Sequence, residues 1–491
     1  DKSKSGSNGM TSLTVVSLLS LSIGLIIAIY AASGLAGEST CSWLNKFAPA
    51  VMMLILMASC VWMVKLEPLS IWTPLPWFLV ANAVYFGFGP LVYHFGVQET
   101  VNACHKLFHV SERQLLRTNT LNAIGIVCVL LGFLVSARLS GSRGNQIFME
   151  KKILSKKLVV AVFLMIGLPV KYLLYMPHIF GMSREILPYS IGQFQNLTFL
   201  SIIPLMGLVS WRAKGWLIVL ILVVISEIFF TVLEFSKASL LITLIMVVLG
   251  KFYYDPRIRI LVVGGLLVIV AFLFIMPVVT YARGKIVQIS GNHYTATMSQ
   301  RAEIMKDYIF SQQPKPFKML FLPSGLWVRL NYANAQSFSM DQYDRGIPGK
   351  SFLLCAYSPI PRFFWPGKPS IVDVGVDYSE LFTGKRNSSY GAGFYAEAYW
   401  NGGYPLVIAS CLFVGVLFAI FSAYSTAKMS CASLIFLPVI FWGMRMGFRP
   451  DGWFVIDYFG PIFICVFTHF LIKFINSILI RVTRVADSSC T

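Results

Sequence analysis

Cationic side chains that suit a phosphate group stand out late in the sequence. The stretch 358–369 holds Arg362 and Lys368 among four prolines, which stiffen the backbone and fix the two cations relative to one another. Arginine offers phosphate a planar fork of donors, and lysine offers a point charge. The stretch therefore predicts a rigid clamp for a pyrophosphate. A basic loop that rests on lipid headgroups is the alternative.

Two further arginines, Arg445 and Arg449, lie four residues apart in the stretch 442–453. They would share one helix face if the helix extends that far, and two cations on one face favour an anion between them. Asp451 could instead neutralise one of them. Arg283 follows directly on an expected membrane span, at the depth of a lipid diphosphate.

The stretch 388–404 is rich in tyrosine, tryptophan and small residues. The rings of Tyr390 and Tyr399 offer faces on which sugars stack. Glu397 is one of the few acids close to an expected membrane span, so we interpret it as a general base for a sugar hydroxyl. The competing interpretation is an interfacial helix start in which Glu397 pairs with a nearby arginine.

Metal and nucleic-acid chemistry are not predicted. The six histidines and nine cysteines are dispersed, and none shows the spacing of a metal site. The formal net charge of +19 does not require nucleic acid, because cytoplasmic loops of membrane proteins collect lysine and arginine. We therefore expect no metal, no cofactor and no nucleic-acid partner.

The composition of the 491 residues excludes an ordinary soluble enzyme, because 56% are hydrophobic and only 12% are charged. Soluble domains carry about 25% charged residues. Apolar runs of about 20 residues recur along the chain, which is typical of membrane-spanning helices. The sequence predicts an all-α polytopic membrane protein of about twelve helices. They are expected at 13–33, 48–64, 71–93, 118–137, 158–176, 191–209, 215–233, 238–250, 260–280, 404–424, 431–447 and 454–472.

The distribution of lysine and arginine among the short loops predicts that both termini are cytoplasmic. Residues 1–9 precede Met10 and are expected to be an expression remnant. Residues 10–280 would form spans one to nine, and 404–491 would form the last three spans and a cytoplasmic tail. The segment 281–403 would be a large outer loop with short interfacial helices, packed as a cap on the bundle. Within the spans, Lys171 and Glu227 could form an ion pair or part of a conduit, and the alternative is that Lys171, near a helix end, snorkels to the membrane surface.

The order of these features resembles the O-antigen (Wzy-type) polysaccharide repeat-unit polymerases of bacterial envelopes. The similar parts are the many-span bundle, the late outer loop, the PR-x-x-WP-x-KP element at 361–369 and the G-x-x-x-E-A-Y-x-N-x-G element at 393–403. An arginine in the penultimate outer segment, here Arg445 or Arg449, also fits. O-antigen ligases are similar in layout.

The resemblance implies a membrane glycosyltransferase of the GT-C type in the bacterial inner membrane, with its active site facing the periplasm. Its donor and acceptor would be glycans on undecaprenyl pyrophosphate, and a chain-length regulator could be a partner. It implies that four arginines face the diphosphate, that Glu397 is the base, and that Lys368, Tyr390 and Tyr399 line the sugar site. Those arginines are Arg283, Arg362, Arg445 and Arg449. An O-antigen ligase is the nearest alternative, and a transporter of lipid-linked oligosaccharide or polymer is the alternative from another class.

Overall fold

The computed structural model describes residues 3–489, apart from 34–37, 107, 141–147, 149–153, 181, 183–191, 210–213, 291–295, 311–322, 361–363, 366, 385 and 387–388. Every regular element in these residues is a helix. Nine of the described helices are long and apolar enough to cross a membrane, and two shorter apolar helices occur at Thr14–Tyr30 and Leu434–Gly447. The expectation of an all-α polytopic membrane protein is therefore confirmed.

The chain forms two compact units. The first comprises Asp1–Glu150, Pro323–Cys431 and Val439–Phe470, and the second comprises Lys151–Leu322, Ala432–Pro438 and Leu471–Thr491. Two of the five boundaries between them fall within helices, one in α23 (Leu437–Gly447) and one in α24 (Gly460–Ser489).

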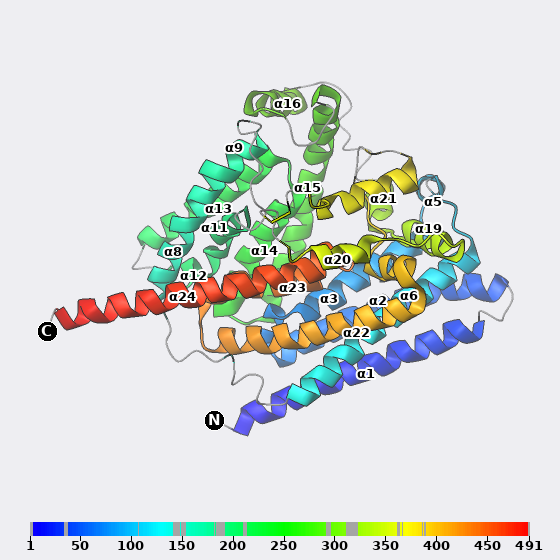
Figure 1. The fold of residues 1–491 in the computed structure, drawn as a ribbon, viewed down its shortest axis with the longest axis horizontal. Helices are drawn as coiled ribbons and strands as arrows, with labels where there is room; N and C mark the ends of the chain where they lie inside the picture. Colours follow the sequence, from blue (N-terminus) through cyan, green and yellow to red (C-terminus); the bar gives the residue numbers. More distant parts are fainter. Residues whose placement is uncertain are drawn as a thin grey trace. The chain divides into compact units, whose positions relative to one another are not determined.

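The first unit is built around long helices that pack along one another, coloured blue, cyan and orange in Figure 1. Shorter helices complete it. Its elements, besides the parts of α23 and α24, are α1 (Ser3–Ser33), α2 (Glu38–Leu66), η1 (Pro68–Trp72), α3 (Pro74–Asn82), η2 (Ala83–Phe88), η3 (Gly89–Leu91), α4 (Val92–Phe95), α5 (Gln98–His105), α6 (Glu112–Ser140), α18 (Pro323–Leu330), α19 (Ala333–Asp344), η6 (Ser351–Leu353), α20 (Leu354–Tyr357), η7 (Ile371–Asp373), α21 (Val374–Thr383), α22 (Phe394–Ser430) and η9 (Phe454–Phe459).

Small residues bring α6 and α22 into close contact. A Cβ on Gly415 would lie 2.1 Å from the carbonyl oxygen of Val129, and one on Gly132 would lie 2.3 Å from that of Leu412. Backbones can approach this closely only where side chains are absent, which is a common packing mode of membrane helices. The pair fixes α22, and with it the residues at the start of α22.

The loop between the expected ninth and tenth spans contributes buried polar structure. In α19, Gln336 exchanges two amide hydrogen bonds with Asn122 of α6, at 2.7 and 3.1 Å. The hydroxyl of Ser337 lies 3.1 Å from that of Thr118. Because buried polar groups need partners, these pairs fix the position of α19 against α6.

Helix α22 begins at Phe394, ten residues before the expected position 404. Its path bends at Gly403, whose φ of 63° is left-handed and favours glycine. At the other end of the expected loop, α15 continues to Ser290 and not 280, so Arg283 lies within this helix. The segment between the two helices is correspondingly shorter than 281–403.

The second unit contains the remaining helices. The expected helix at 191–209 is an irregular helical run of three short pieces, in which Thr198 and Ser201 hydroxyls bond to nearby carbonyls and Pro204 lacks an N–H. The elements are α8 (Lys156–Pro169), η4 (Val170–Tyr175), α9 (Met176–Ile179), η5 (Gln193–Asn196), α11 (Leu197–Leu200), α12 (Ile202–Met206), α13 (Lys214–Glu234), α14 (Lys237–Tyr254), α15 (Ile258–Ser290), α16 (Met298–Phe310) and η8 (Leu434–Phe436).

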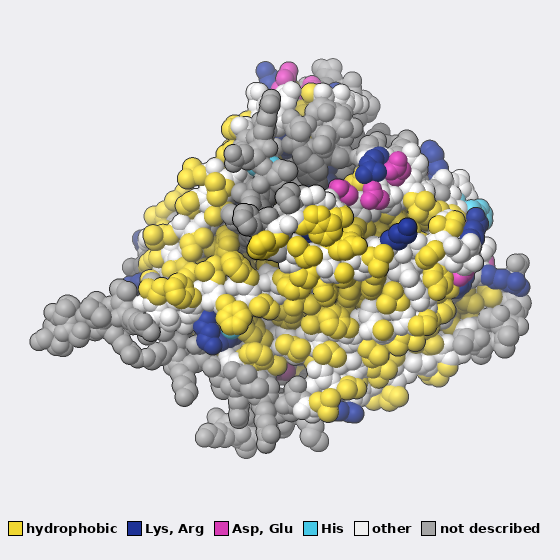
Figure 2. Space-filling model, in the orientation of Figure 1, with side chains coloured by type: hydrophobic (Ala, Val, Ile, Leu, Met, Phe, Trp, Pro, Cys, Tyr) yellow, Lys and Arg dark blue, Asp and Glu magenta, His cyan; other side chains and the backbone are white. Residues whose placement is uncertain are grey.

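The surface of the long helices is apolar. In Figure 2 hydrophobic side chains cover α22, and charged side chains are sparse over it. Exposed side chains on this helix include Ile408, Leu412 and Ile420. Such a surface suits lipid contact, in agreement with the membrane-spanning character of the helices.

Candidate active site

Glu397 lies in the first turn of α22 and is completely buried. Its Oε1 accepts a hydrogen bond of 2.6 Å from the Ser351 hydroxyl, and its Oε2 accepts one of 2.6 Å from the backbone N–H of Phe454. Asn401, one turn further along α22, donates to the same Ser351 oxygen at 2.9 Å. Glu397 therefore joins α22, η6 and the start of η9, and no arginine neutralises it as an ion-pair partner among the described residues.

A second carboxylate occupies the same helix start. Oδ2 of Asp457 accepts a 3.1 Å hydrogen bond from the N–H of Trp453, the residue before η9. The first N–H groups of a helix lack partners within the helix, so acids are favourable there. A Cβ at Gly452 would lie 2.0 Å from Oδ2 of Asp457, so a larger residue at this turn would displace the carboxylate.

Arg449 makes long ion pairs with Asp457 and with a third acid, Asp451. Its Nε is 3.4 Å from Oδ1 of Asp451, and its NH2 is 3.5 Å from Oδ2 of Asp457. The Arg449 side chain is 38% exposed, whereas those of Asp451 and Asp457 are 14% and 2% exposed. The guanidinium therefore rests on buried carboxylates and keeps an open side.

Asp451 is the acid of this cluster with the weakest hydrogen bonding. Its Oδ2 accepts a long hydrogen bond of 3.3 Å from the Tyr332 hydroxyl, while its buried Oδ1 has no hydrogen-bond partner among the described residues. Burial raises the pKa of Asp451, and the nearby Arg449 charge offsets only part of this effect. Burial also raises the pKa of Tyr332, whose ring packs edge-on against Tyr85. Asp451 thus has the properties of a carboxyl that can gain and lose a proton.

Arg445 and Arg449 do not share a helix face. Helix α23 ends at Gly447, so Arg445 is in its last turn and Arg449 is in the turn that follows. The Arg445 guanidinium lies 4.7 Å from the centre of the Trp442 ring, a cation–π distance. Among the described residues it makes no ion pair with a carboxylate. It is therefore a cation whose charge is not neutralised within this part of the chain.

Tyr399 belongs to a different cluster. Its hydroxyl accepts from Arg117 and donates to Oδ1 of Asp344 at 3.0 Å, and Arg117 also binds Asp344 directly. The hydrogen bond from Arg117 lowers the pKa of Asp344. The ring of Tyr399 is buried, so the structure assigns it to an ion-pair network and offers no open sugar-stacking face at this position.

The other expected ligand residues are dispersed. The Lys368 ammonium donates hydrogen bonds to the carbonyls of Ser358 and Ile360, at 3.1 and 2.9 Å. These bonds tie Lys368 to the start of its own loop. Tyr390 packs against Phe382, and its N–H bonds to a carbonyl of α21. Arg283 is exposed in the second unit, where its Nε donates to a backbone carbonyl. Arg362 lies outside the described residues.

Sequence reasoning missed Asp457 and Tyr332. Asp457 had a detectable signal, because an acid within an apolar run is costly and therefore informative. No sequence signal pointed to Tyr332, since its contact is with Asp451, more than 100 positions away in the sequence. In the described part of the chain, no set of three or more acids, histidines and cysteines is arranged to hold a metal ion.

Comparison with known proteins adds no relative. No protein-family model, no curated protein and no solved structure matches this chain. The functional argument consequently rests on the residues and their geometry.

Proposed function

We propose that the chain is a membrane glycosyltransferase that polymerises oligosaccharide repeat units carried on undecaprenyl pyrophosphate, at the periplasmic face of the bacterial inner membrane. The product would be O-antigen or a related surface polysaccharide. The observation that carries the proposal is Arg449: its side chain is 38% exposed and lies against two buried acids, four residues after Arg445, which has no carboxylate partner among the described residues. Apolar helices provide the lipid-facing surroundings that a polyprenyl substrate needs.

The reaction breaks the bond between the sugar anomeric carbon and the pyrophosphate oxygen. The acceptor hydroxyl oxygen forms a new bond to that carbon, its proton passes to the Asp451 carboxylate, and the polyprenyl pyrophosphate leaves with the bonding electron pair. Arg445 and the open side of Arg449 stabilise the negative charge that develops on the leaving group. A carboxyl whose pKa is raised toward the working pH is suited to accept the proton.

Charge balance favours this division of roles. With both acids ionised, Arg445, Arg449, Asp451 and Asp457 sum to zero. When Asp451 takes up the proton, the same four groups carry one net positive charge at the moment that the leaving group becomes more negative. Glu397, whose two oxygens are both engaged, is a positioning residue that fixes the start of η9 beneath the cluster.

The test is incubation of the purified protein in nanodiscs with a lipid-pyrophosphate oligosaccharide, resolved as a ladder on a gel. We expect a ladder of repeat units, and a loss of about 100- to 1,000-fold in rate for Arg445→Ala or Arg449→Ala. Arg386→Ala removes an exposed arginine with surface ion pairs and is the matched control, expected to retain activity.

Other outcomes would replace the proposal. Transfer of glycan only to a lipid A core acceptor would establish a ligase. Movement of the lipid across vesicles without bond formation would establish a transporter. Full activity in folded Arg445→Ala and Arg449→Ala proteins would show that these arginines do not stabilise the leaving group.

A further inference from the structure

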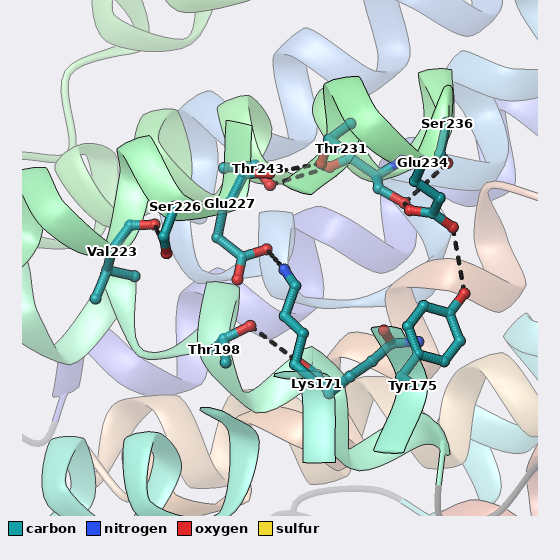
Figure 3. A network of polar contacts seen from close by, with 12 residues as sticks. Lys171, Tyr175, Thr198, Val223, Ser226, Glu227, Thr231, Glu234, Ser236 and Thr243 are labelled. Carbon is teal, nitrogen blue, oxygen red and sulfur yellow. Dashed lines mark hydrogen bonds and ion pairs between the residues drawn. The ribbon is translucent and has the colours of Figure 1, made fainter. Parts of the chain in front are cut away.

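The second unit contains an ion pair buried among membrane helices. Nζ of Lys171 lies 2.6 Å from Oε2 of Glu227, and each side chain is 4% exposed. The Lys171 ammonium also lies 4.3 Å from the centre of the Phe230 ring. Figure 3 shows Lys171 reaching up from its helix to Glu227 on α13.

A second carboxylate lies on the same helix. Glu234 is seven residues after Glu227, which is two turns or about 10 Å along the axis. Its Oε1 accepts from the Tyr175 hydroxyl and its Oε2 from the Ser239 hydroxyl, both at 3.2 Å. Ser236 extends this chain, with its hydroxyl 2.9 Å from that of Ser239 (Figure 3). These polar groups gather at the end of α13, two turns from Glu227.

The groups that face this network are few. Elements η4 and α14 contribute Lys171, Tyr175 and Lys237, the last with its Nζ at the Met276 sulfur. From α16, Arg301 is completely buried and donates NH1 to the carbonyls of Leu233 and Glu234. Helix α11 brings the Thr198 hydroxyl, and neither α11 nor α12 contains a titratable side chain. Two carboxylates are therefore accompanied by three cations, Lys171, Lys237 and Arg301.

Three observations favour a function over a purely structural pair. A buried ion pair seldom stabilises more than apolar residues of the same volume, and ionisable groups within membrane spans are costly. Lys171 lies in the π-helical segment η4 directly after Pro169, and such segments are frequent at functional sites. Oε1 of Glu227 is buried and has no hydrogen-bond partner among the described residues. This oxygen is therefore available to bind a proton.

We propose that Glu227 is a proton-binding site, with the buried Oε1 as the atom that receives the proton. Uptake of one proton from water converts the carboxylate to a neutral carboxyl. Lys171 keeps its ammonium and loses the ionic partner, so the interior of the unit gains one positive charge. The unit would thereby respond to proton concentration, independently of the chemistry proposed for the first unit.

The test is infrared difference spectroscopy of the full chain in nanodiscs, recorded as the pH is lowered over the range in which the protein stays folded. We expect a carbonyl band at the high frequency of a protonated carboxyl in apolar surroundings. Glu227→Gln should remove this band. Glu303→Gln, which changes an exposed glutamate of α16, should leave it in place.

Two further variants keep the test decisive if Glu227→Gln does not fold. The double change Lys171→Gln and Glu227→Gln removes both charges together and should also lack the band. Lys171→Gln alone should shift the appearance of the band to higher pH, because loss of the ammonium favours the neutral carboxyl. Absence of the band in the unmodified protein, or its loss in Glu234→Gln with retention in Glu227→Gln, would overturn the proposal.

Discussion

The variants Glu397→Gln and Asp451→Asn test whether Glu397 only anchors the site and whether Asp451 is the acid that accepts the proton. Glu397 is held by two donors, the Ser351 hydroxyl and the Phe454 N–H. A glutamine can still accept from Phe454 and can donate to Ser351, so it replaces charge-assisted hydrogen bonds by neutral ones. Each exchange costs about 1 kcal/mol, and we expect the fold and most of the activity to survive. An asparagine at position 451 cannot accept the proton, and we expect a loss of about 100- to 10,000-fold.

The truncation Glu397→Ala should behave differently from Glu397→Gln. It leaves two buried groups, the Ser351 hydroxyl and the Phe454 N–H, without the carboxylate, at about 1–3 kcal/mol each. The total of about 2–6 kcal/mol is a large part of a typical unfolding free energy of about 5–15 kcal/mol. We therefore expect less folded protein and not a slower catalytic step.

Both effects can be measured on the same preparations. Initial rates of ladder formation report catalysis, and thermal unfolding followed by size-exclusion chromatography in detergent reports folding. Glu380→Gln is the control, since Glu380 is exposed and pairs only at the surface. Refutation would come from a Glu397→Gln protein that is folded yet loses as much rate as Asp451→Asn, because Glu397 would then be the base.

Three further changes test individual contacts. Gly452→Ala should disrupt the site and slow ladder formation, because its Cβ would lie 2.0 Å from a carboxylate oxygen. The control Gly265→Ala, with open space around it, should leave the stability unchanged or raise it by up to about 1 kcal/mol. Equal melting temperatures and rates for the two variants would contradict this. Asp344→Asn should lower the melting temperature at neutral pH by an amount equivalent to at most about 1 kcal/mol. Since Arg117 lowers the pKa of Asp344, this contribution is present above the unfolded value of about 3.9 and is lost as the pH falls through the folded value, so the two proteins should converge in acid. Arg445→Lys should recover only part of the rate lost in Arg445→Ala, because lysine supplies charge without the planar fork; full recovery would show that charge alone matters.

The helical membrane architecture could be predicted from the sequence because long apolar runs have few alternatives. Nine expected spans have a long helix at their position, although several boundaries differ. The start of α22 lies ten residues before the expected position, since the polar and glycine-containing residues 394–403 do not look like a span. They become helical because tertiary contacts, such as the one from Glu397 to Phe454, compensate their polarity.

The site was only partly predictable. Glu397, Arg445 and Arg449 were found because charged residues beside apolar runs are costly to retain. Their partners depend on contacts between distant segments, and no local spacing encodes that Ser351 would bind Glu397 or that Tyr332 would reach Asp451. The competing interpretation paired Glu397 with an arginine; in the described residues its partners are instead the Ser351 hydroxyl and the Phe454 N–H at the start of a helix.

The three acids of the site differ in how firmly they are held, and this difference assigns their roles. Glu397 has a donor on each oxygen, and Asp457 is tied to the Trp453 N–H at the start of the next helix. Asp451 has one long hydrogen bond and one buried oxygen without a hydrogen-bond partner in the described residues. A group that must change its protonation state during a reaction cannot be fully committed to donors that fix its charge. Under the proposed function, Glu397 and Asp457 would hold the frame on which Arg449 rests, and Asp451 would be the acid that exchanges a proton with the substrate.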